Sequence, residues 1–209
     1  MAIVQWSCER FVDETFSKAP APGGGGVAAM AGALGTALAG MVCNLTSGKK
    51  KYAAYEADIQ RIIAEAESMK NELMALIDKD AENFIPLSRV YGMPSSTDEE
   101  KKLKQEKMQA ALLVAIAAPI EIMKIAAGAV SLHEKLLEKG STLAVSDVGC
   151  GVLCLKAAIQ SAWLNVLINL RSITDEAYVK SVRDELVPLM EQSTGLCDEI
   201  YEKVTDKLS

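Results

Sequence analysis

The chain has 209 residues, about half of them apolar and about a quarter charged, and its formal net charge at pH 7 is −6. This length favours a single domain over residues 1–209, and the acidic balance gives no electrostatic basis for binding nucleic acid. Alanine is abundant, aromatic residues are few, and alternating β-branched runs are nearly absent. The composition therefore predicts an all-α protein, a mainly antiparallel bundle of about six or seven helices.

The N-terminal sequence and the cysteines both favour the cytoplasm. MAIVQWSCERF has neither a basic nor an apolar signal region. The five cysteines are odd in number and form no CxxC motif, which is typical of reduced thiols. Cys150 and Cys154 lie four residues apart and are predicted to be buried, and His133, the only histidine, is predicted at the surface. We therefore expect neither a zinc site nor another metal site.

The first predicted helix runs from about Ser7 to residue 18. Ser7 is a good N-cap, and the spacing of Phe11, Val12 and Phe16 predicts that these side chains face the core.

A glycine-rich turn, Gly23–Gly26, follows two prolines and leads into a run of small apolar residues. The prolines discourage helix before them, so we predict a helix from about Gly26 to Leu45. A turn at a helix N-terminus presents free N–H groups, which suits an anion or a polar ligand. A flexible loop before an ordinary core helix is the alternative. The segment Gly24–Ala29 fits GxGxxA, but no strand precedes it, which excludes a dinucleotide site.

Small residues line one face of this second helix. Ala28, Gly32, Thr36 and Gly40 recur every four residues. Glycine inside a helix costs roughly 1 kcal/mol relative to alanine, so we expect another helix, from this fold or from a symmetric copy, to approach closely. The uncharged run over residues 27–45 is also long enough to test as a membrane span, but its Ala and Gly content favours a buried helix.

The third predicted helix runs from about Lys51 to Ile85, where Pro86 is expected to end it. Apolar residues recur in steps of three and four, at Tyr52, Tyr55, Ile59, Ile62, Ala66, Met69, Leu73 and Leu76. Asp80 and Asn83 occupy the next two positions of this seam. Burying a carboxylate costs free energy unless the group is paired or hydrogen-bonded. Asp80 is therefore either functional or exposed to solvent at an open end of the bundle.

Three more helices are predicted in the second half of the chain. Thr97 and the serine before it fit as N-caps of a helix that restarts at Pro119 and ends at Gly140. A last helix is predicted over residues 174–208, capped by its first residue and kinked at Pro188.

The helix between them carries polar residues at both ends. Ser146 and Asp147 begin it, and N-capping by this pair is the alternative to a functional role. Asn165 and Asn169 share one face of an otherwise apolar helix that runs to about Arg171. Two amides on one stripe need partners, which either a core network or a bound polar heterocycle would supply.

Five segments, in this order along nearly the whole chain, resemble one family. They are PAPGGGGVAAMAGALGTALAGMV from Pro20, NLTSGKKKY from Asn44, DKDAENF from Asp78, SD at Ser146, and NVLINLRSITDE from Asn165. The chain thus resembles the cyclodeaminase/cyclohydrolase family of folate enzymes. This family includes the C-terminal domain of formiminotransferase-cyclodeaminase and freestanding methenyltetrahydrofolate cyclohydrolases. One departure is Gly26, where serine is expected.

The resemblance implies an all-helical homodimer or higher oligomer that acts on tetrahydrofolate derivatives without a metal or other cofactor. A cyclohydrolase adds water to 5,10-methenyltetrahydrofolate and opens it to 10-formyltetrahydrofolate. A cyclodeaminase closes 5-formiminotetrahydrofolate to 5,10-methenyltetrahydrofolate and expels ammonia. Both reactions pass through a tetrahedral carbon between two nitrogens and need a carboxylate to move protons. Because no formiminotransferase domain is present, we expect the cyclohydrolase, with the cyclodeaminase as the alternative.

With this resemblance, the proton-transfer residue is expected to be Asp147 or Asp80. The expected substrate-binding residues are Gly23, Gly24, Gly25, Gly26, Asn44, Lys49, Lys50, Lys51, Ser146, Asn165, Asn169 and Arg171. The two helical amides would read the pterin edge, and the glycine turn would let backbone approach the ligand. The lysines would meet the anionic, possibly polyglutamylated, tail or simply form a solvated helix end. A non-catalytic folate-binding protein and a structural helical oligomer are the alternatives outside catalysis.

Overall fold

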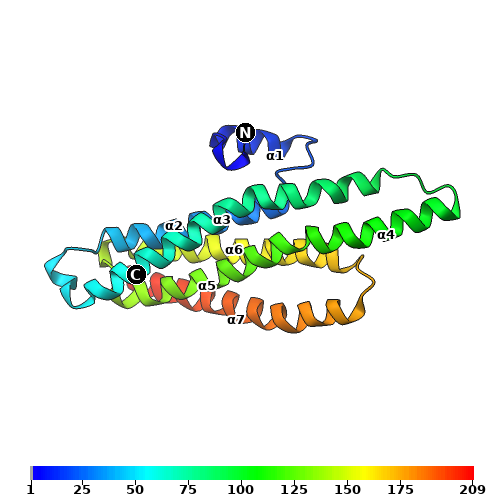
Figure 1. Ribbon diagram of the computed structural model, residues 1–209. Helices are drawn as coiled ribbons and strands as arrows, with labels where there is room; N and C mark the ends of the chain where they lie inside the picture. Colours follow the sequence, from blue (N-terminus) through cyan, green and yellow to red (C-terminus); the bar gives the residue numbers. More distant parts are fainter. Residues whose placement is uncertain (1) are drawn as a thin grey trace.

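The computed structural model describes residues 2–209, and the chain is helical over most of this range, with no β-strand in it (Figure 1). The helices are α1 (Cys8–Phe16), α2 (Gly24–Asn44), α3 (Glu56–Tyr91), α4 (Asp98–Ala115), α5 (Ala117–Lys139), α6 (Val145–Leu170) and α7 (Glu176–Leu208). Short 3₁₀ helices, η1 (Ile3–Gln5), η2 (Lys50–Tyr55) and η3 (Thr142–Ala144), connect or precede them. Helices α2 to α7 run alongside one another in an elongated bundle, and α1 lies at its edge (Figure 1). The all-α bundle predicted from the composition is confirmed.

Helix α2 packs most extensively against α6 and α3, and its glycines explain how. A Cβ placed on Gly35 would lie 2.8 Å from the carbonyl oxygen of Gly151 in α6. A Cβ on Gly32 would lie 3.2 Å from Leu73 of α3 and 3.4 Å from Ala158 of α6. The predicted close approach of other helices is therefore confirmed at these positions. Gly40 differs, because no atom lies within 4 Å of its Cβ position.

Three helical stretches are long and apolar enough to cross a membrane, judged by length and composition alone. They are Gly24–Asn44, Asp98–Lys139 and Thr142–Leu170. Between 44% and 56% of the apolar window in each stretch is buried inside the bundle. The first of them, α2, thus has a buried side, as expected, and also an exposed apolar side.

His133 is buried in the core rather than exposed, so the predicted surface position was wrong. Its Nε2 lies 2.9 Å from the carbonyl oxygen of Gly35, and its ring occupies the space that a side chain on Gly151 would fill. Burial lowers the pKa of His133 to about 4, which keeps the ring neutral at pH 7. The pattern around His133 misled us because a single hydrogen bond to the backbone is enough to accommodate a neutral imidazole in a core.

The cysteines follow the prediction only in part. All five are free, but Cys150 is exposed and Cys154 only half-buried, so the expected burial of this pair was wrong for Cys150. The two fully buried thiols are Cys43 and Cys197. Burial raises the pKa of each of these two thiols to about 12. They are therefore protonated, unreactive core residues.

Helix α1 has the predicted N-cap but not the predicted packing. Ser7 Oγ accepts a hydrogen bond from the backbone N–H of Arg10. Phe11 is buried, whereas Val12 and Phe16 are exposed, Phe16 by 92%. The inward placement of Val12 and Phe16 was wrong because α1 lies at the edge of the bundle and buries a single side chain.

Helix α3 follows the predicted seam but does not end at Pro86. Its seam residues from Ile59 to Leu76 are buried or half-buried, and Asn83 is buried as well. The helix continues through Pro86 to Tyr91. Pro86 and Glu82, whose carbonyl would accept from residue 86, are both exposed, so water can replace the missing bond.

The later helix ends agree with the sequence except at two N-caps. Thr97 forms the predicted capping box with Glu100, and the chain restarts at Ala117, two residues before Pro119. Helix α6 begins at Val145 without a side-chain cap, so the N-cap prediction for Ser146 was wrong. Asp175 rather than Thr174 caps α7 by accepting from the N–H of Tyr178.

Helix α5 ends at Lys139 with Gly140 as its C-cap, so the predicted stop at this glycine is confirmed. Helix α7 runs without a break through Pro188.

Candidate active site

A cavity of about 310 Å³ lies where the N-terminus of α2 meets α3 and α6. Its polar lining comes from Asp80, Asn165, Asn169 and the backbone of Gly23, Gly24 and Gly25, whereas Gly26 does not line it. Its remaining walls are formed by Pro20, Ala21, Phe84, Leu87, Tyr91, Ala115, Pro119 and Ile168. A concave, largely apolar site with a few converging polar groups is typical of a pocket for a small organic ligand.

Asp80 reaches this cavity from α3 and lies directly over the first turn of α2. A Cβ on Gly25 would lie 2.1 Å from Asp80 Oδ1, so no residue larger than glycine fits there while the carboxyl keeps its place. The backbone N–H of Gly26 donates to Asp80 and favours its ionised form. Burial outweighs this hydrogen bond and raises the pKa of Asp80 to about 6. Asp80 can therefore exchange a proton near neutral pH.

The two amides of α6 lie beside Asp80 in the same cavity. Asn165 Nδ2 donates to the carbonyl of Ser161 at 2.9 Å, and Asn169 Nδ2 donates to the carbonyl of Asn165 at 2.8 Å. Each amide nitrogen thus bonds within its own helix, which leaves each amide oxygen available to a donor on a ligand. A Cβ on Gly24 would lie 2.9 Å from Asn165 Nδ2, so the glycine turn also makes room for this amide.

The apolar wall of the cavity was missed by the sequence analysis. Phe84, Leu87 and Tyr91 follow Asp80 at positions four, seven and eleven residues later, along one face of α3. Two of these residues lie beyond Pro86, where the helix was expected to end. The continuing periodicity past the proline was the signal that could have found them.

The neighbouring carboxylate, Asp78, has a different role. It accepts a hydrogen bond from the backbone N–H of Ile3 and so anchors the N-terminal η1 turn to α3. Of the two aspartates in the DKDAENF segment, Asp78 therefore has a structural role, and Asp80 lines the cavity.

The other expected site residues lie at the opposite end of α2 and α6. The lysines at positions 49–51 follow the C-terminus of α2, about 30 Å from Gly24 at 1.5 Å per residue. Ser146 and Asp147 are in the first turn of α6, with Asp147 about 27 Å from Asn165 by the same rise. None of them lines the cavity, and neither does Arg171, which caps the C-terminus of α6.

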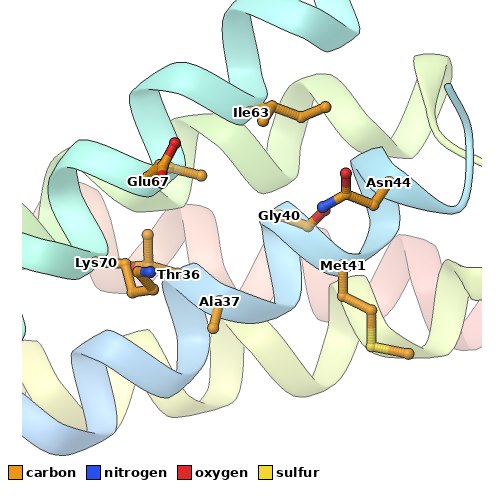
Figure 2. A pocket seen from close by; sticks show the side chains of 9 residues that line it. Thr36, Ala37, Gly40, Met41, Asn44, Ile63, Glu67 and Lys70 are labelled. Carbon is orange, nitrogen blue, oxygen red and sulfur yellow. The ribbon is translucent and has the colours of Figure 1, made fainter.

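Asn44 borders a different hollow of about 420 Å³ between α2 and α3 (Figure 2). Figure 2 shows Thr36, Gly40 and Asn44 along α2, facing Glu67 and Lys70 of α3. The amide of Asn44 donates to the carbonyl of Gly40 within its own helix. This hollow has no buried carboxylate, so it lacks the proton-transfer group of the first cavity.

Over residues 2–209, no three His, Cys, Asp or Glu side chains are grouped closely enough to hold a metal ion. The family model named formiminotransferase-cyclodeaminase matches residues 7–187 of this sequence. The chain belongs to this family. The resemblance drawn from the motifs is thereby confirmed.

Members of the formiminotransferase-cyclodeaminase family match this chain to different extents. A methenyltetrahydrofolate cyclohydrolase of Methylorubrum extorquens is 40% identical over 96% of this chain and 97% of its own length. A formimidoyltransferase-cyclodeaminase of Rattus norvegicus is 29% identical over 92% of this chain, which spans only 36% of the rat protein. The crystal structure of a formiminotetrahydrofolate cyclodeaminase from Thermotoga maritima aligns with a TM-score of 0.79 and 30% identity, covering 98% of this chain and 96% of that one.

Proposed function

We propose that this protein is a methenyltetrahydrofolate cyclohydrolase, which converts 5,10-methenyltetrahydrofolate and water to 10-formyltetrahydrofolate. The observation that carries the proposal is a half-buried carboxyl group with a pKa of about 6 beside two amides in one cavity. The 40% identity to the Methylorubrum cyclohydrolase over nearly the full length of both chains supports the same reaction.

Asp80 is the proton-transfer residue in this proposal. In its ionised form, Asp80 takes a proton from water while the water oxygen bonds to the methenyl carbon between N5 and N10. The tetrahedral carbon then loses its hydroxyl proton to solvent and forms a carbonyl. As the carbon–N5 bond breaks, Asp80 returns its proton to N5, so the reaction releases one proton overall. A carboxyl with a pKa near neutrality can both accept and donate this proton.

The remaining cavity groups position the substrate. The oxygens of Asn165 and Asn169 can accept hydrogen bonds from N–H groups on the pterin edge. Phe84 and Tyr91 supply apolar surface for the flat ring. The glycine turn lets the ligand approach the N–H groups at the start of α2 closely.

A spectroscopic assay tests the proposal. The purified protein is added to 5,10-methenyltetrahydrofolate, and the decay of the near-ultraviolet methenyl absorbance is compared with a blank. We expect faster decay with the wild type and a rate near that of the blank with Asp80→Asn. Equal decay with the wild type and the blank would refute the cyclohydrolase proposal.

A cyclodeaminase is the second candidate, favoured by the Thermotoga maritima structure. That chain is named a formiminotetrahydrofolate cyclodeaminase, and 96% of its length aligns here. A chain of this length can therefore be named a cyclodeaminase without an aligned formiminotransferase domain, so the absence of that domain from the alignment does not distinguish the two reactions. Release of ammonia from 5-formiminotetrahydrofolate, with growth of the methenyl absorbance, would establish the cyclodeaminase instead.

The proposal also includes the setting of the enzyme. Water is the only co-reactant, so we propose that no resident cofactor or metal takes part. The five free cysteines are compatible with a reducing, cytoplasmic compartment. We further propose that the protein acts as a homodimer, because apolar side chains remain exposed along α2 and α6.

A further inference from the structure

The wall of the cavity opposite the glycine turn is formed where α4 ends and α5 begins. Ala115 is the last residue of α4, and Pro119 lies in the first turn of α5. Both residues are buried, and both line the cavity. Helices α3 and α6 each pack against both α2 and α5, so the α4–α5 junction lies across the cavity from the start of α2 and from Asp80.

Pro119 leaves the carbonyl oxygen of Ala115 without its helical donor. In a continuous helix this oxygen would accept from the N–H of residue 119, and proline has no N–H. The bonds on either side are present, because Ile116 donates to Leu112 at 3.0 Å and Ile120 donates to Ile116 at 3.2 Å. Within residues 2–209, no turn N–H and no side-chain donor bonds to the Ala115 oxygen. The junction therefore contains a free backbone acceptor.

This free oxygen lies on the cavity side of the junction. A helical carbonyl points along the axis toward the residue four positions later, so it lies on the face that the two residues share. Ala115 and Pro119 share the face that lines the cavity. A proline ring also crowds the carbonyl four residues before it and tilts that carbonyl away from the helix axis. A buried carbonyl needs a partner, which a ligand or water in the cavity must supply.

The other two prolines inside helices leave their free carbonyls to bulk water. Pro86 of α3 and Pro188 of α7 are exposed, and so is the residue four positions before each of them. Water can therefore satisfy both of those carbonyls. Pro119 differs because it and Ala115 are both buried. The acceptor at the α4–α5 junction is thus available to a ligand in the cavity.

We propose that the carbonyl oxygen of Ala115 accepts hydrogen bonds from the N3–H and 2-amino groups of the pterin ring. This inference rests on the proposed function. The two groups are neighbours on one edge of the pterin, and a carbonyl oxygen has two lone pairs. When N5 of the ring faces Asp80, this edge faces the α4–α5 junction across the cavity. Pro119 is then a specificity-determining residue, because it keeps the acceptor free.

Two ligands and one substitution test this contact without turnover. Tetrahydrofolate carries both N–H groups, and its 2-desamino-2-methyl analogue lacks the amino group. We expect the wild type to bind tetrahydrofolate about tenfold more tightly than the analogue in calorimetric titrations. Pro119→Ala supplies an N–H that donates to Ala115, so it should bind tetrahydrofolate about tenfold more weakly and lose most of this preference.

The preference separates a lost contact from a displaced wall. A substitution that only moves the wall weakens both ligands equally and keeps the preference, and that result in Pro119→Ala would overturn the proposal. Equal binding of the two ligands by the wild type would also overturn it. Pro188→Ala is the matched control, because it adds an N–H within α7, which does not line the cavity. It should leave both affinities unchanged.

Nuclear magnetic resonance tests the same carbonyl in the unmodified chain. Alanine precedes isoleucine at Ala2, Ala115 and Ala158, so ¹³C-carbonyl alanine with ¹⁵N isoleucine gives one signal for each of these three pairs. A carbonyl carbon moves downfield when its oxygen accepts a hydrogen bond. We expect tetrahydrofolate to move the Ala115 signal downfield and the analogue to move it less, while Ala158, in the middle of α6, stays unchanged. An equal response of Ala115 to both ligands would overturn the proposal.

The binding results are separable from the proposed function. A wild type that binds tetrahydrofolate with the expected preference but turns over neither folate refutes the proposed function and supports the pterin contact. A wild type that binds neither ligand overturns the pterin contact itself.

Discussion

Replacing Asp80 with asparagine should stabilise the protein while removing its activity. Burial moves the pKa of Asp80 from 3.8 to about 6. This change corresponds to about 3 kcal/mol of unfolding free energy that the ionised carboxylate costs at pH 7. The folded chain holds this proton more tightly than the unfolded chain, so wild-type stability falls as pH rises from about 4 to about 6. Asparagine has no charge to desolvate, and Asp80→Asn should therefore be more stable at pH 7 by up to about 3 kcal/mol.

Urea unfolding at pH 4 and pH 7 measures this difference, and the methenyl absorbance measures the activity. We expect the gain in stability at pH 7, a much smaller gain at pH 4, and a loss of 10²- to 10⁴-fold in kcat. The wild-type kcat should also rise as pH increases through about 6. Asp78→Asn, two residues earlier, keeps an oxygen for the N–H of Ile3 and should change neither property much. Unchanged stability in Asp80→Asn at both pH values would refute the reasoning about burial.

Three further predictions follow from the cavity and the core. Gly25→Ala should lower activity at least tenfold, because its Cβ would lie 2.1 Å from Asp80 Oδ1. The control is Gly195→Ala in α7, whose Cβ would meet nothing within 4 Å. This control should raise the unfolding free energy by up to about 1 kcal/mol. Tyr91→Ala should raise KM for the folate about tenfold with little effect on thermal unfolding, because Tyr91 lines the cavity and is otherwise exposed. The pKa of His133 falls from 6.5 to about 4 in the fold, so the unfolding free energy of the wild type should drop by up to about 3 kcal/mol as pH falls between these values. His133→Gln keeps an N–H for the carbonyl of Gly35 and should not show this loss in matched urea titrations.

The sequence predicted the buried seam of α3 well because its periodicity has a single physical cause. Residues such as Ile59, Ile62 and Leu73 recur every three to four positions, and only one face of a helix satisfies that spacing. Asp80 interrupts the same spacing, which is why it could be singled out before the structure was known. Its place over Gly25 depends on the approach of α3 to α2, which no local pattern encodes.

The wrong predictions share a dependence on tertiary contacts. Pro86 does not end α3, because Leu87 and Val90 beyond it are buried against the bundle and this packing offsets the lost hydrogen bond. His133 is buried because Gly35 and Gly151, both distant in sequence, supply a carbonyl and an empty space. Phe16 is exposed because α1 lies at the edge of the bundle, where there is no second layer to cover its apolar side.

The division of the site residues between two ends of the bundle also could not be seen in the sequence. When only their order along the chain is known, the motifs from Gly23 to Asn165 can all be assigned to a single site. Helix lengths separate them, because eighteen residues of helix hold Asp147 roughly 27 Å from Asn165. The distance along a rigid helix therefore decides which candidate residues can contact the same ligand within one subunit.

The glycines at the start of α2 connect the stability of the protein to its chemistry. Each glycine inside a helix costs roughly 1 kcal/mol relative to alanine, so a chain selected for stability alone would replace them. Alanine at Gly25 or Gly24 would push away the carboxyl of Asp80 or the amide of Asn165. A displaced Asp80 would gain water, and its pKa would return toward 3.8, too low to return a proton to a leaving nitrogen near pH 7. The close packing that these glycines allow is thus what makes a carboxyl group useful as both base and acid in this cavity.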